Sequence, residues 1–370
     1  MDINRDLLTW EDMTTLELRA IYERFGYRRY HMGKFEPYDM YLENRSFLKS
    51  ETVITFTDPS GKLMALKPDV TMSIVKNTQS DVPSQKLYYI ENVFRMAPSG
   101  REYREISQMG LEYIGAQGAY AEAETLLLAI QSLEAISPNY VLNVSHMGFM
   151  SALFSYCGFD RETAAEIQSS LSQKNTPALM SLASRQGLSD DKLALFRTAV
   201  SISAPVLEAV NTLRSYPLTP DMDSALEDIR QAAEALAVAG HADKVFFDLA
   251  LINDMDYYNG IVFQGYIKGL PRAVLSGGRY DNLMRRFGKS QPALGFALYL
   301  GELSRAFSSG RDTDVDILLL YGDSSGTEVM KAVQCLSADG KCVLSEREDP
   351  GTVRYKRLLR LEGSKLTEVV

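Results

Sequence analysis

Three alternating residues, Gln108, Gly110 and Glu112, form the first group in the sequence that could bind a small ligand. Alternate residues of a strand share one face, so an amide, a gap without a side chain and a carboxylate would line one surface. The gap lets a ligand approach the backbone, and the carboxylate can hold an ammonium group. The alternative is an exposed sheet face with cross-strand ion pairs, which the hairpin pattern by itself favours.

Signatures of common enzyme chemistry are missing from the sequence. It contains no GxxxxGK[ST], GxGxxG, HExxH or GxSxG motif. Its histidines are scattered, and such residues are more often structural or exposed than catalytic; they are His31, His146 and His241. Its cysteines lack CxxC spacing and sit in apolar stretches, so we expect buried reduced thiols and no zinc site; they are Cys157, Cys335 and Cys342. We assign no catalytic residue, no metal ligand and no cofactor.

The ligand-binding group lies in a predicted long antiparallel hairpin. Residues 86–95 and 103–115 have strand character, and the turn formers Pro98, Ser99 and Gly100 lie between them. Upstream, the pattern predicts a helix over residues 10–25, a hairpin of strands 52–57 and 62–66, and a helix over 70–78. Asp69 precedes this last helix, where it can cap the helix or contact a ligand. Downstream we expect a helix over 119–135 and a strand over 140–145.

The composition and periodicity of the sequence change at two points. Residues 147–240 are rich in Ala, Leu, Ser, Glu and Gln at helical spacing, which predicts a helical insertion. Strand character returns at 244–249, 260–266 and 272–275, so the insertion splits a sheet. Beyond Gly310 we expect strands at 316–321, 342–344 and 355–361 and a helix at 328–336. We therefore predict a core of residues 1–312, with the insertion at 147–240, and a small α/β segment at 313–370 of about 58 residues, which is marginal alone.

Composition limits the classes of function. With 45% hydrophobic and 24% charged residues, the 370-residue chain has the composition of a soluble protein with a proper core. Its net charge of −9 disfavours a broad nucleic-acid surface, apart from a local basic patch at Arg285, Arg286 and Lys289. The N-terminus lacks a signal-peptide pattern, and no apolar run approaches the ~18 residues of a membrane span. We expect a cytoplasmic protein that binds neither membrane nor nucleic acid.

Four segments, in their order and separations, resemble the catalytic core of histidyl-tRNA synthetase. They are ALKPDVT at 65–71, VFRMAPSGREYREISQMGLE at 93–112, NDMDYYNGIVF at 253–263, and SGGRYDNLMRRFG with the following PALGFALYLGEL within 276–303. The resemblance covers about residues 5 to 305. It implies an α+β, class II aminoacyl-tRNA synthetase-like fold, in which helices flank an antiparallel sheet, here with the helical insertion and the small C-terminal α/β segment.

The resemblance also implies a histidine-sized pocket. In the synthetase, the residues matching Asp69, Thr71, Gln108 and Glu112 hold the amino acid, chiefly by its α-ammonium. The arginine matching Arg95 binds the α-phosphate and the carboxylate. The remaining matches are the tyrosines that border the imidazole and a glycine pair on a neighbouring strand, here Tyr257, Tyr258, Gly277 and Gly278.

Departures from the synthetase pattern fall on the ATP side. An arginine that serves adenylate formation is replaced by Asn253, and the family's GLER places glycine and arginine where this chain has Tyr299 and Glu302. Each such donor contributes on the order of 10² to 10³ in rate, so losing two costs roughly 10⁴ or more if their effects combine independently. We expect no adenylate synthesis. Gly33 replaces the motif-one proline, which leaves the dimer-interface segment less defined.

The chain combines a histidine pocket that lacks the activating arginines with a C-terminal segment shorter than the hundred or so residues of an anticodon-binding domain. In both respects it looks like the regulatory subunit of ATP phosphoribosyltransferase. The resemblance implies a non-catalytic chain that self-associates as a dimer, activates a short catalytic subunit and enables feedback inhibition by histidine in the first step of histidine biosynthesis. Its pocket would sense histidine or survive as a support for an interface. The alternatives are an active, truncated synthetase-like ligase and a non-enzymatic tRNA or amino-acid sensor.

Overall fold

The computed structural model describes residues 8–43, 53–79, 82–97, 102–251, 257–307 and 313–369. The chain divides into two compact units, one of residues 13–306 and one that joins residues 1–12 to 307–370. No helix in the described ranges is long and apolar enough to cross a membrane. The larger unit carries the predicted ligand-binding residues.

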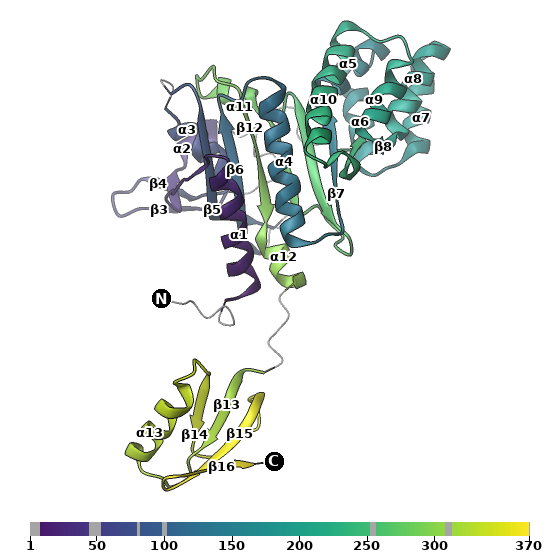
Figure 1. Ribbon diagram of the computed structural model, residues 1–370. Helices are drawn as coiled ribbons and strands as arrows, with labels where there is room; N and C mark the ends of the chain where they lie inside the picture. Colours follow the sequence, from purple (N-terminus) through teal and green to yellow (C-terminus); the bar gives the residue numbers. More distant parts are fainter. Residues whose placement is uncertain are drawn as a thin grey trace. The chain divides into compact units, whose positions relative to one another are not determined.

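A nine-stranded sheet forms the centre of the larger unit (Figure 1). In spatial order its strands are β1 (Arg28–Arg29), β5 (Gln85–Met96), β6 (Tyr103–Ile114), β12 (Ala293–Tyr299), β11 (Leu275–Arg279), β10 (Ile261–Ile267), β7 (Tyr140–His146), β9 (Val245–Asp248) and β8 (Ser203–Pro205). Most pairs are antiparallel, and β6 pairs with β12 although the two strands are far apart in the sequence. The predicted α+β class with an antiparallel sheet flanked by helices is confirmed.

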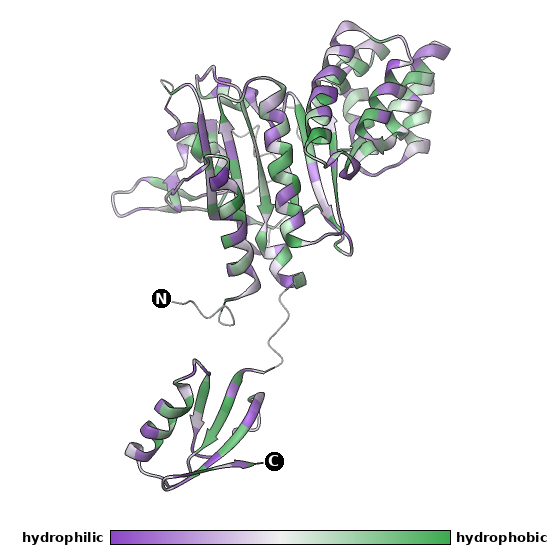
Figure 2. Ribbon diagram, viewed as in Figure 1, coloured by the Kyte–Doolittle hydropathy of each residue, from purple (hydrophilic) through white to green (hydrophobic). Residues whose placement is uncertain are grey.

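Two helices cover one face of this sheet, α1 (Trp10–Arg24) and α4 (Gly118–Ile136) (Figure 1). The Tyr22 ring of α1 packs at a tilt against Tyr88 and edge-on against Phe296 of the sheet, and its hydroxyl hydrogen-bonds the Ser132 hydroxyl of α4 at 2.8 Å. Leu133 of α4 lies directly over Gly265, where a side chain would collide with it. Hydrophobic residues concentrate on the central strands of the sheet (Figure 2). The buried residues of the two helices include Leu18 and Tyr22 of α1 and Leu126, Ile130 and Leu133 of α4.

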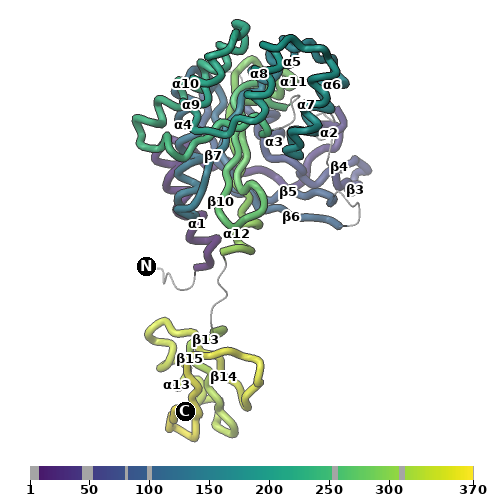
Figure 3. Tube along the Cα trace, turned by 90° about the vertical axis from the view of Figure 1, so that its right-hand side faces the viewer, coloured from purple at the N-terminus to yellow at the C-terminus, as the bar shows by residue number. Residues whose placement is uncertain are grey.

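The opposite face is covered by a smaller layer. It consists of the helices α2 (Asp39–Glu43), α3 (Val70–Asn77) and α11 (Asp281–Arg286) and the three-stranded sheet of β2 (Phe35–Pro37), β4 (Leu63–Leu66) and β3 (Thr55–Thr57). Its core joins Met72 and Val75 of α3 to Tyr89 and Val93 of β5 and to Tyr280. Figure 3 shows the long β5–β6 hairpin beside this layer. The candidate site forms between the two.

Helices dominate residues 147–238. They are α5 (Met147–Cys157), α6 (Arg161–Ser172), α7 (Thr176–Arg185), α8 (Asp190–Ser201), α9 (Val206–Arg214) and α10 (Pro220–Val238). Thr219 caps α10 by accepting a hydrogen bond from the Met222 N–H, and Pro220 occupies the first turn, where proline is tolerated. The short helix η3 (Ala242–Lys244) leads back to β9 of the sheet. These elements lie where the sequence predicts the insertion.

The C-terminal unit contains a four-stranded sheet with one covering helix. The order is β14 (Val343–Glu346), β13 (Val315–Leu320), β15 (Tyr355–Glu362) and β16 (Lys365–Val369), with α13 (Gly326–Ser337) between β13 and β14 in the chain. The first three strands are parallel, and β16 returns antiparallel to β15. Ser325 and Glu328 close the start of α13 in a reciprocal capping box.

Some local predictions are wrong. The strand expected at 272–275 is β11, at 275–279. Its position was mispredicted because Gly277 and Gly278 have poor strand propensity; they occur in the strand because neighbouring strands and side chains leave no room for a Cβ there. Strands β12 and β16 were not predicted. Cys157 is buried as expected, but Cys335 and Cys342 are exposed. Cys335 lies on the outer side of α13, since Val329, Ala332, Val333 and Leu336 face its core, and Cys342 precedes β14.

Candidate functional site

Cross-strand register places the predicted ligand-binding group on one face of the sheet, in three successive rows. The first row joins Glu112 to Gly295 and Gly278 on β12 and β11. The second joins Gly110 to Tyr89, Ala297 and Ser276. The third joins Gln108 to Glu91 and Tyr299. This face is the one covered by α3 and α11, and the alternation predicted from the sequence is confirmed by these pairings.

Glu112 is the most enclosed acid of the site. It is 1% exposed, and its two carboxylate oxygens accept hydrogen bonds from the Thr71 hydroxyl at 2.7 Å and the Tyr280 hydroxyl at 2.6 Å. Burial raises the pKa of Glu112 to about 8, although these two hydroxyls lower it, and the nearby Asp69 raises it further. A cation in this pocket would therefore be bound by a carboxyl group that is otherwise held largely neutral at pH 7.

Asp69 serves both the fold and the site. One of its oxygens accepts the Met72 N–H at 2.8 Å, which caps α3, and the other lies 3.8 Å from the Arg95 guanidinium. Arg95 also donates its Nε–H to the Pro68 carbonyl at 2.8 Å. Burial raises the pKa of Asp69, and Arg95 opposes that rise. The two sequence interpretations of Asp69, cap and ligand contact, are compatible in this geometry.

Tyrosine side chains surround the two acids. The Tyr257 ring packs at a tilt against the Tyr258 ring, with centroids 4.7 Å apart, and its centroid lies 6.2 Å from that of the Tyr280 ring. Burial, and then the charges of Asp69, raises the pKa of Tyr257 well above its usual range, and the Tyr258 phenol is shifted in the same direction by burial and by Tyr299. These phenols stay protonated at neutral pH. They form an aromatic, hydrogen-bonding wall of the kind that suits a small polar ring.

The glycines of the site divide between the two faces of the sheet. A Cβ at Gly278 would lie 2.7 Å from the Tyr258 ring, so Gly278 borders the pocket. A Cβ at Gly277 would meet Phe263 and Phe296 on the α4 side, so the structure does not bring Gly277 into the site. A Cβ at Gly295 would lie 1.9 Å from a carboxylate oxygen of Glu112. Gly295 therefore leaves the space that the Glu112 carboxylate occupies.

The expected ATP side differs from the amino-acid side. Glu302 lies at the start of α12 (Leu300–Phe307), half exposed, and pairs only loosely with Arg305 at 3.7 Å. Tyr299 ends β12 in the third row. Asn253 lies outside the described residues. Among the described residues, an acid and a phenol therefore stand where the synthetase pattern has an arginine and a glycine, and Arg95 is the cation that is kept.

Several site residues were not singled out from the sequence. Tyr280 donates to Glu112, and Tyr89 fills the space beside Gly110, where a Cβ would lie 2.4 Å from its hydroxyl. Lys67 is fully buried and bonds Glu91 at 2.9 Å. Tyr280 lies inside the SGGRYDNL run and Lys67 inside ALKPDVT, so the resemblance marked their segments. Their roles depend on contacts between segments that are distant in the sequence.

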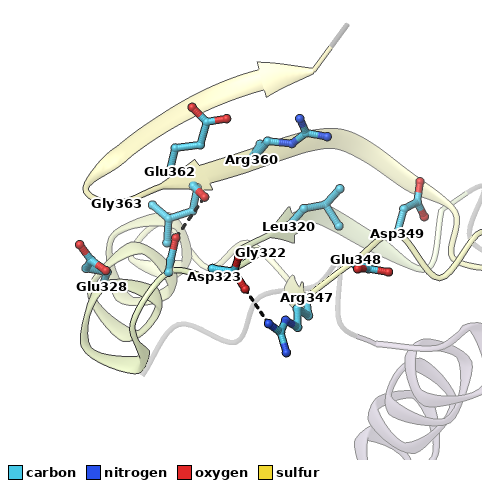
Figure 4. Close-up of a pocket in the computed structure, with 12 residues that line it drawn as sticks. Leu320, Gly322, Asp323, Glu328, Arg347, Glu348, Asp349, Arg360, Glu362 and Gly363 are labelled. Atoms are coloured by element: carbon cyan, nitrogen blue, oxygen red, sulfur yellow. Dashed lines mark hydrogen bonds and ion pairs between the residues drawn. The ribbon is translucent and has the colours of Figure 1, made fainter.

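A cavity of about 620 Å³ lies in the C-terminal unit at the carboxyl ends of the parallel strands (Figure 4). Its charged lining has two guanidinium groups, Arg347 and Arg360, and five carboxylates, which are Asp323, Glu328, Glu348, Asp349 and Glu362. Arg347 is already paired with Asp323 at 2.6 Å. The excess of negative charge does not suit a phosphate backbone, and this cavity is the weaker candidate site.

Comparison with known proteins agrees with the geometry of the larger unit. The family model for histidyl-tRNA synthetase matches residues 9–303. An ATP phosphoribosyltransferase regulatory subunit from Clostridium kluyveri is 27% identical over 339 residues, which are 87% of this chain and 85% of that protein.

Solved structures share the fold. An ATP phosphoribosyltransferase regulatory subunit/histidyl-tRNA synthetase from Bacillus halodurans has a TM-score of 0.78 at 24% identity, over 95% of this chain and 93% of that one. A chain of the ATP phosphoribosyl transferase complex from Thermotoga maritima has a TM-score of 0.62 at 18% identity, over 79% of this chain and 97% of that one. Because both structures are less than 25% identical in sequence to this chain, they establish a shared fold.

Proposed function

The chain belongs to the histidyl-tRNA synthetase family, and from that premise we propose that it is a non-catalytic regulatory subunit of ATP phosphoribosyltransferase. On this proposal it activates a short catalytic subunit and makes the complex sensitive to histidine. The similarity to the Clostridium kluyveri regulatory subunit supports the role. The Thermotoga maritima protein of this fold belongs to an ATP phosphoribosyltransferase complex, which supports the catalytic partner.

One observation carries the proposal, the contrast between the two sides of the site. The amino-acid side has a buried carboxyl at Glu112, held by Thr71 and Tyr280, with a second acid at Asp69. Such a pair suits an α-ammonium group. On the nucleotide side, Tyr299 and the acidic Glu302 stand where the synthetase has a glycine and an arginine, so that of its phosphate-binding arginines Arg95 is kept and the arginine of GLER is lost. A chain with this site can hold an amino acid without activating it.

We propose histidine as the effector, bound in this pocket by Asp69, Thr71, Gln108, Glu112, Tyr257 and Tyr258, with Gly278 at its border and Arg95 at its end. For histidine to inhibit, it must bind two states of the complex unequally, typically by about 1 to 3 kcal/mol. Self-association as a dimer is part of the proposal, and exposed apolar side chains on α1, Met13 and Leu16, support it. We place the complex in the cytoplasm, in keeping with three cysteines that are all free thiols.

Reconstitution with a short catalytic subunit tests the proposed function. We expect phosphoribosyl transfer to increase when this chain is added and to fall again when histidine is added. The same preparation should show no histidine-dependent exchange between ATP and pyrophosphate. Exchange above the background of a no-protein control would contradict the proposal and favour an active ligase.

A further inference from the structure

We propose that Tyr299 and Glu91 form a wall that closes the amino-acid pocket on its nucleotide side, so that the site admits a free amino acid and excludes its adenylate. The inference rests on the proposed histidine site and adds the residues that set the size of its ligand. It follows from the row arrangement of the sheet, from a buried ion pair and from the position of one phenol.

The first two rows form the bottom of the pocket, called the floor below, and the third row borders it. Successive rows are two residues apart along the strands, which is about 7 Å. On β6, β12 and β11 the second row is low, because Gly110, Ala297 and Ser276 carry small side chains or none, while at its β5 end the Tyr89 phenol lies against Gly110. The third row rises again, with Glu91, Gln108 and Tyr299 side by side on β5, β6 and β12. An amino acid whose ammonium lies at Glu112 fits on the floor. An adenylate adds a phosphate, a ribose and a purine, and it must pass the third row.

Glu91 is fixed in that row by Lys67. The Lys67 side chain is fully buried and its ammonium lies 2.9 Å from the Glu91 carboxylate, which is itself only 12% exposed. If Glu91 rotated away, a buried ammonium would lose its charged partner, so rotation is strongly opposed. The carboxylate therefore stays in the wall, where it also repels the phosphate of a nucleotide.

Tyr299 supplies the bulk of the wall. It lies directly across from Gln108, and its phenol is close enough to influence those of Tyr89 and Tyr258, which belong to the pocket. Its side chain therefore extends toward the small-residue floor. Tyr258 in turn packs beside Gly278 in the first row, so Tyr299 and Tyr258 together narrow the space above the floor.

The test compares two ligands on matched variants by calorimetry. The ligands are L-histidine and a non-hydrolysable histidyl-adenylate analogue with a sulfamate in place of the phosphate. We expect wild type and Tyr299→Phe, which keeps the ring, to bind histidine and to reject the analogue. Tyr299→Gly should gain at least tenfold in affinity for the analogue while its histidine affinity changes by less than about threefold. Thermal unfolding of each variant confirms that it is folded.

A second variant covers the case in which Tyr299→Gly fails to fold. Glu91→Gln keeps the size of the side chain and an acceptor for Lys67 but removes the charge, and it should improve analogue binding severalfold, most clearly at low salt. The wall is overturned if wild type binds the analogue as tightly as histidine, or if a folded Tyr299→Gly or Glu91→Gln rejects it as strongly as Tyr299→Phe does. Absence of histidine binding to wild type would instead overturn the proposed effector site, while the analogue comparison still decides the wall.

Discussion

Glu112 accepts both of its described hydrogen bonds from hydroxyl groups, Thr71 and Tyr280, and none from a cation. A buried carboxylate is costly without a positive partner. The ammonium of a bound amino acid would supply that partner, and the two hydroxyls would hold the carboxylate in place for it. At the residue scale, Glu112 is a preformed hydrogen-bond acceptor whose negative charge would be neutralised by the ammonium group of the ligand.

The substitution Glu112→Gln tests this role directly. A hydrogen bond to a charged group contributes about 1.5 to 3 kcal/mol, so histidine affinity should fall about tenfold or more. The fold should tolerate the change, because the amide has nearly the same shape and the native carboxyl is largely neutral at pH 7. Calorimetric titration with histidine measures the effect, and Glu166→Gln, an exposed acid on α6, is the matched control. Unchanged affinity in Glu112→Gln would place the effector elsewhere.

The pKa of Glu112, raised to about 8 by burial, predicts a pH-dependent affinity. Ammonium binding requires the ionised carboxylate, so histidine affinity should rise about fivefold from pH 7 to pH 8, above the titration of the imidazole, with proton release on binding. Titration in buffers of different ionisation enthalpy measures those protons, and Glu112→Gln should show a pH-independent affinity.

The same raised pKa has the opposite effect on the stability of the chain without its ligand. A raised carboxyl pKa favours folding at low pH, and that contribution is lost as pH rises from about 4.5 through 8. Affinity that falls over this range would contradict the assignment.

At the scale of elements, strands and helices with strong local patterns were predictable. The β5–β6 hairpin, α1, α3, α4 and β7 lie within a few residues of their predicted positions. The glycine-rich β11 was misplaced and β12 was not predicted, because their strand structure comes from pairing rather than from propensity. Gly277, Gly278 and Gly295 have no side chain to favour a strand, and close packing on both faces explains why they are there.

Gly295→Ala tests whether this close packing maintains the site. The new methyl group would lie 1.9 Å from a Glu112 oxygen and 2.4 Å from the Leu111 carbonyl, so the strands or Glu112 must move. We expect a loss of about 1 to 3 kcal/mol in the free energy of unfolding and loss of histidine binding. Urea denaturation and calorimetry measure the two effects. Gly301→Ala, with open space in α12, should be neutral or stabilise by up to about 1 kcal/mol. Equal effects of the two substitutions would contradict the packing argument.

At the scale of the whole molecule, charge bears on the choice of partner. The chain carries a net charge of −9, and acids outnumber arginines five to two among the charged residues that line the C-terminal cavity. Of the basic patch noted in the sequence, Lys289 bonds backbone carbonyls at the end of α3, those of Val75 and Thr78, and Arg285 bonds Asn282. These cations serve the fold. A protein partner that supplies the catalytic chemistry fits this charge distribution better than a nucleic acid does.

Accordingly, we predict no stable binding of tRNA by the chain alone. Binding that depends on phosphate contacts weakens steeply with salt, and a surface this acidic offers few such contacts. In a filter-binding assay at about 0.15 M salt, micromolar protein should retain no more tRNA than an unrelated acidic protein does. Saturable retention at these concentrations would support the alternative of a tRNA sensor.

The sequence by itself determined the residue types of the amino-acid site, their alternation on a hairpin and the family they resemble, because strand periodicity and short motifs are local properties. Only the tertiary structure decided that Glu112 is buried beneath Tyr280, that Gly278 and not Gly277 faces the pocket, and that Tyr299 aligns with Glu91. Each of these facts depends on the pairing of β6 with β12, of β12 with β11 or of β5 with β6. Burial and pKa are set by neighbours in space, and most of these neighbours lie far away along the chain.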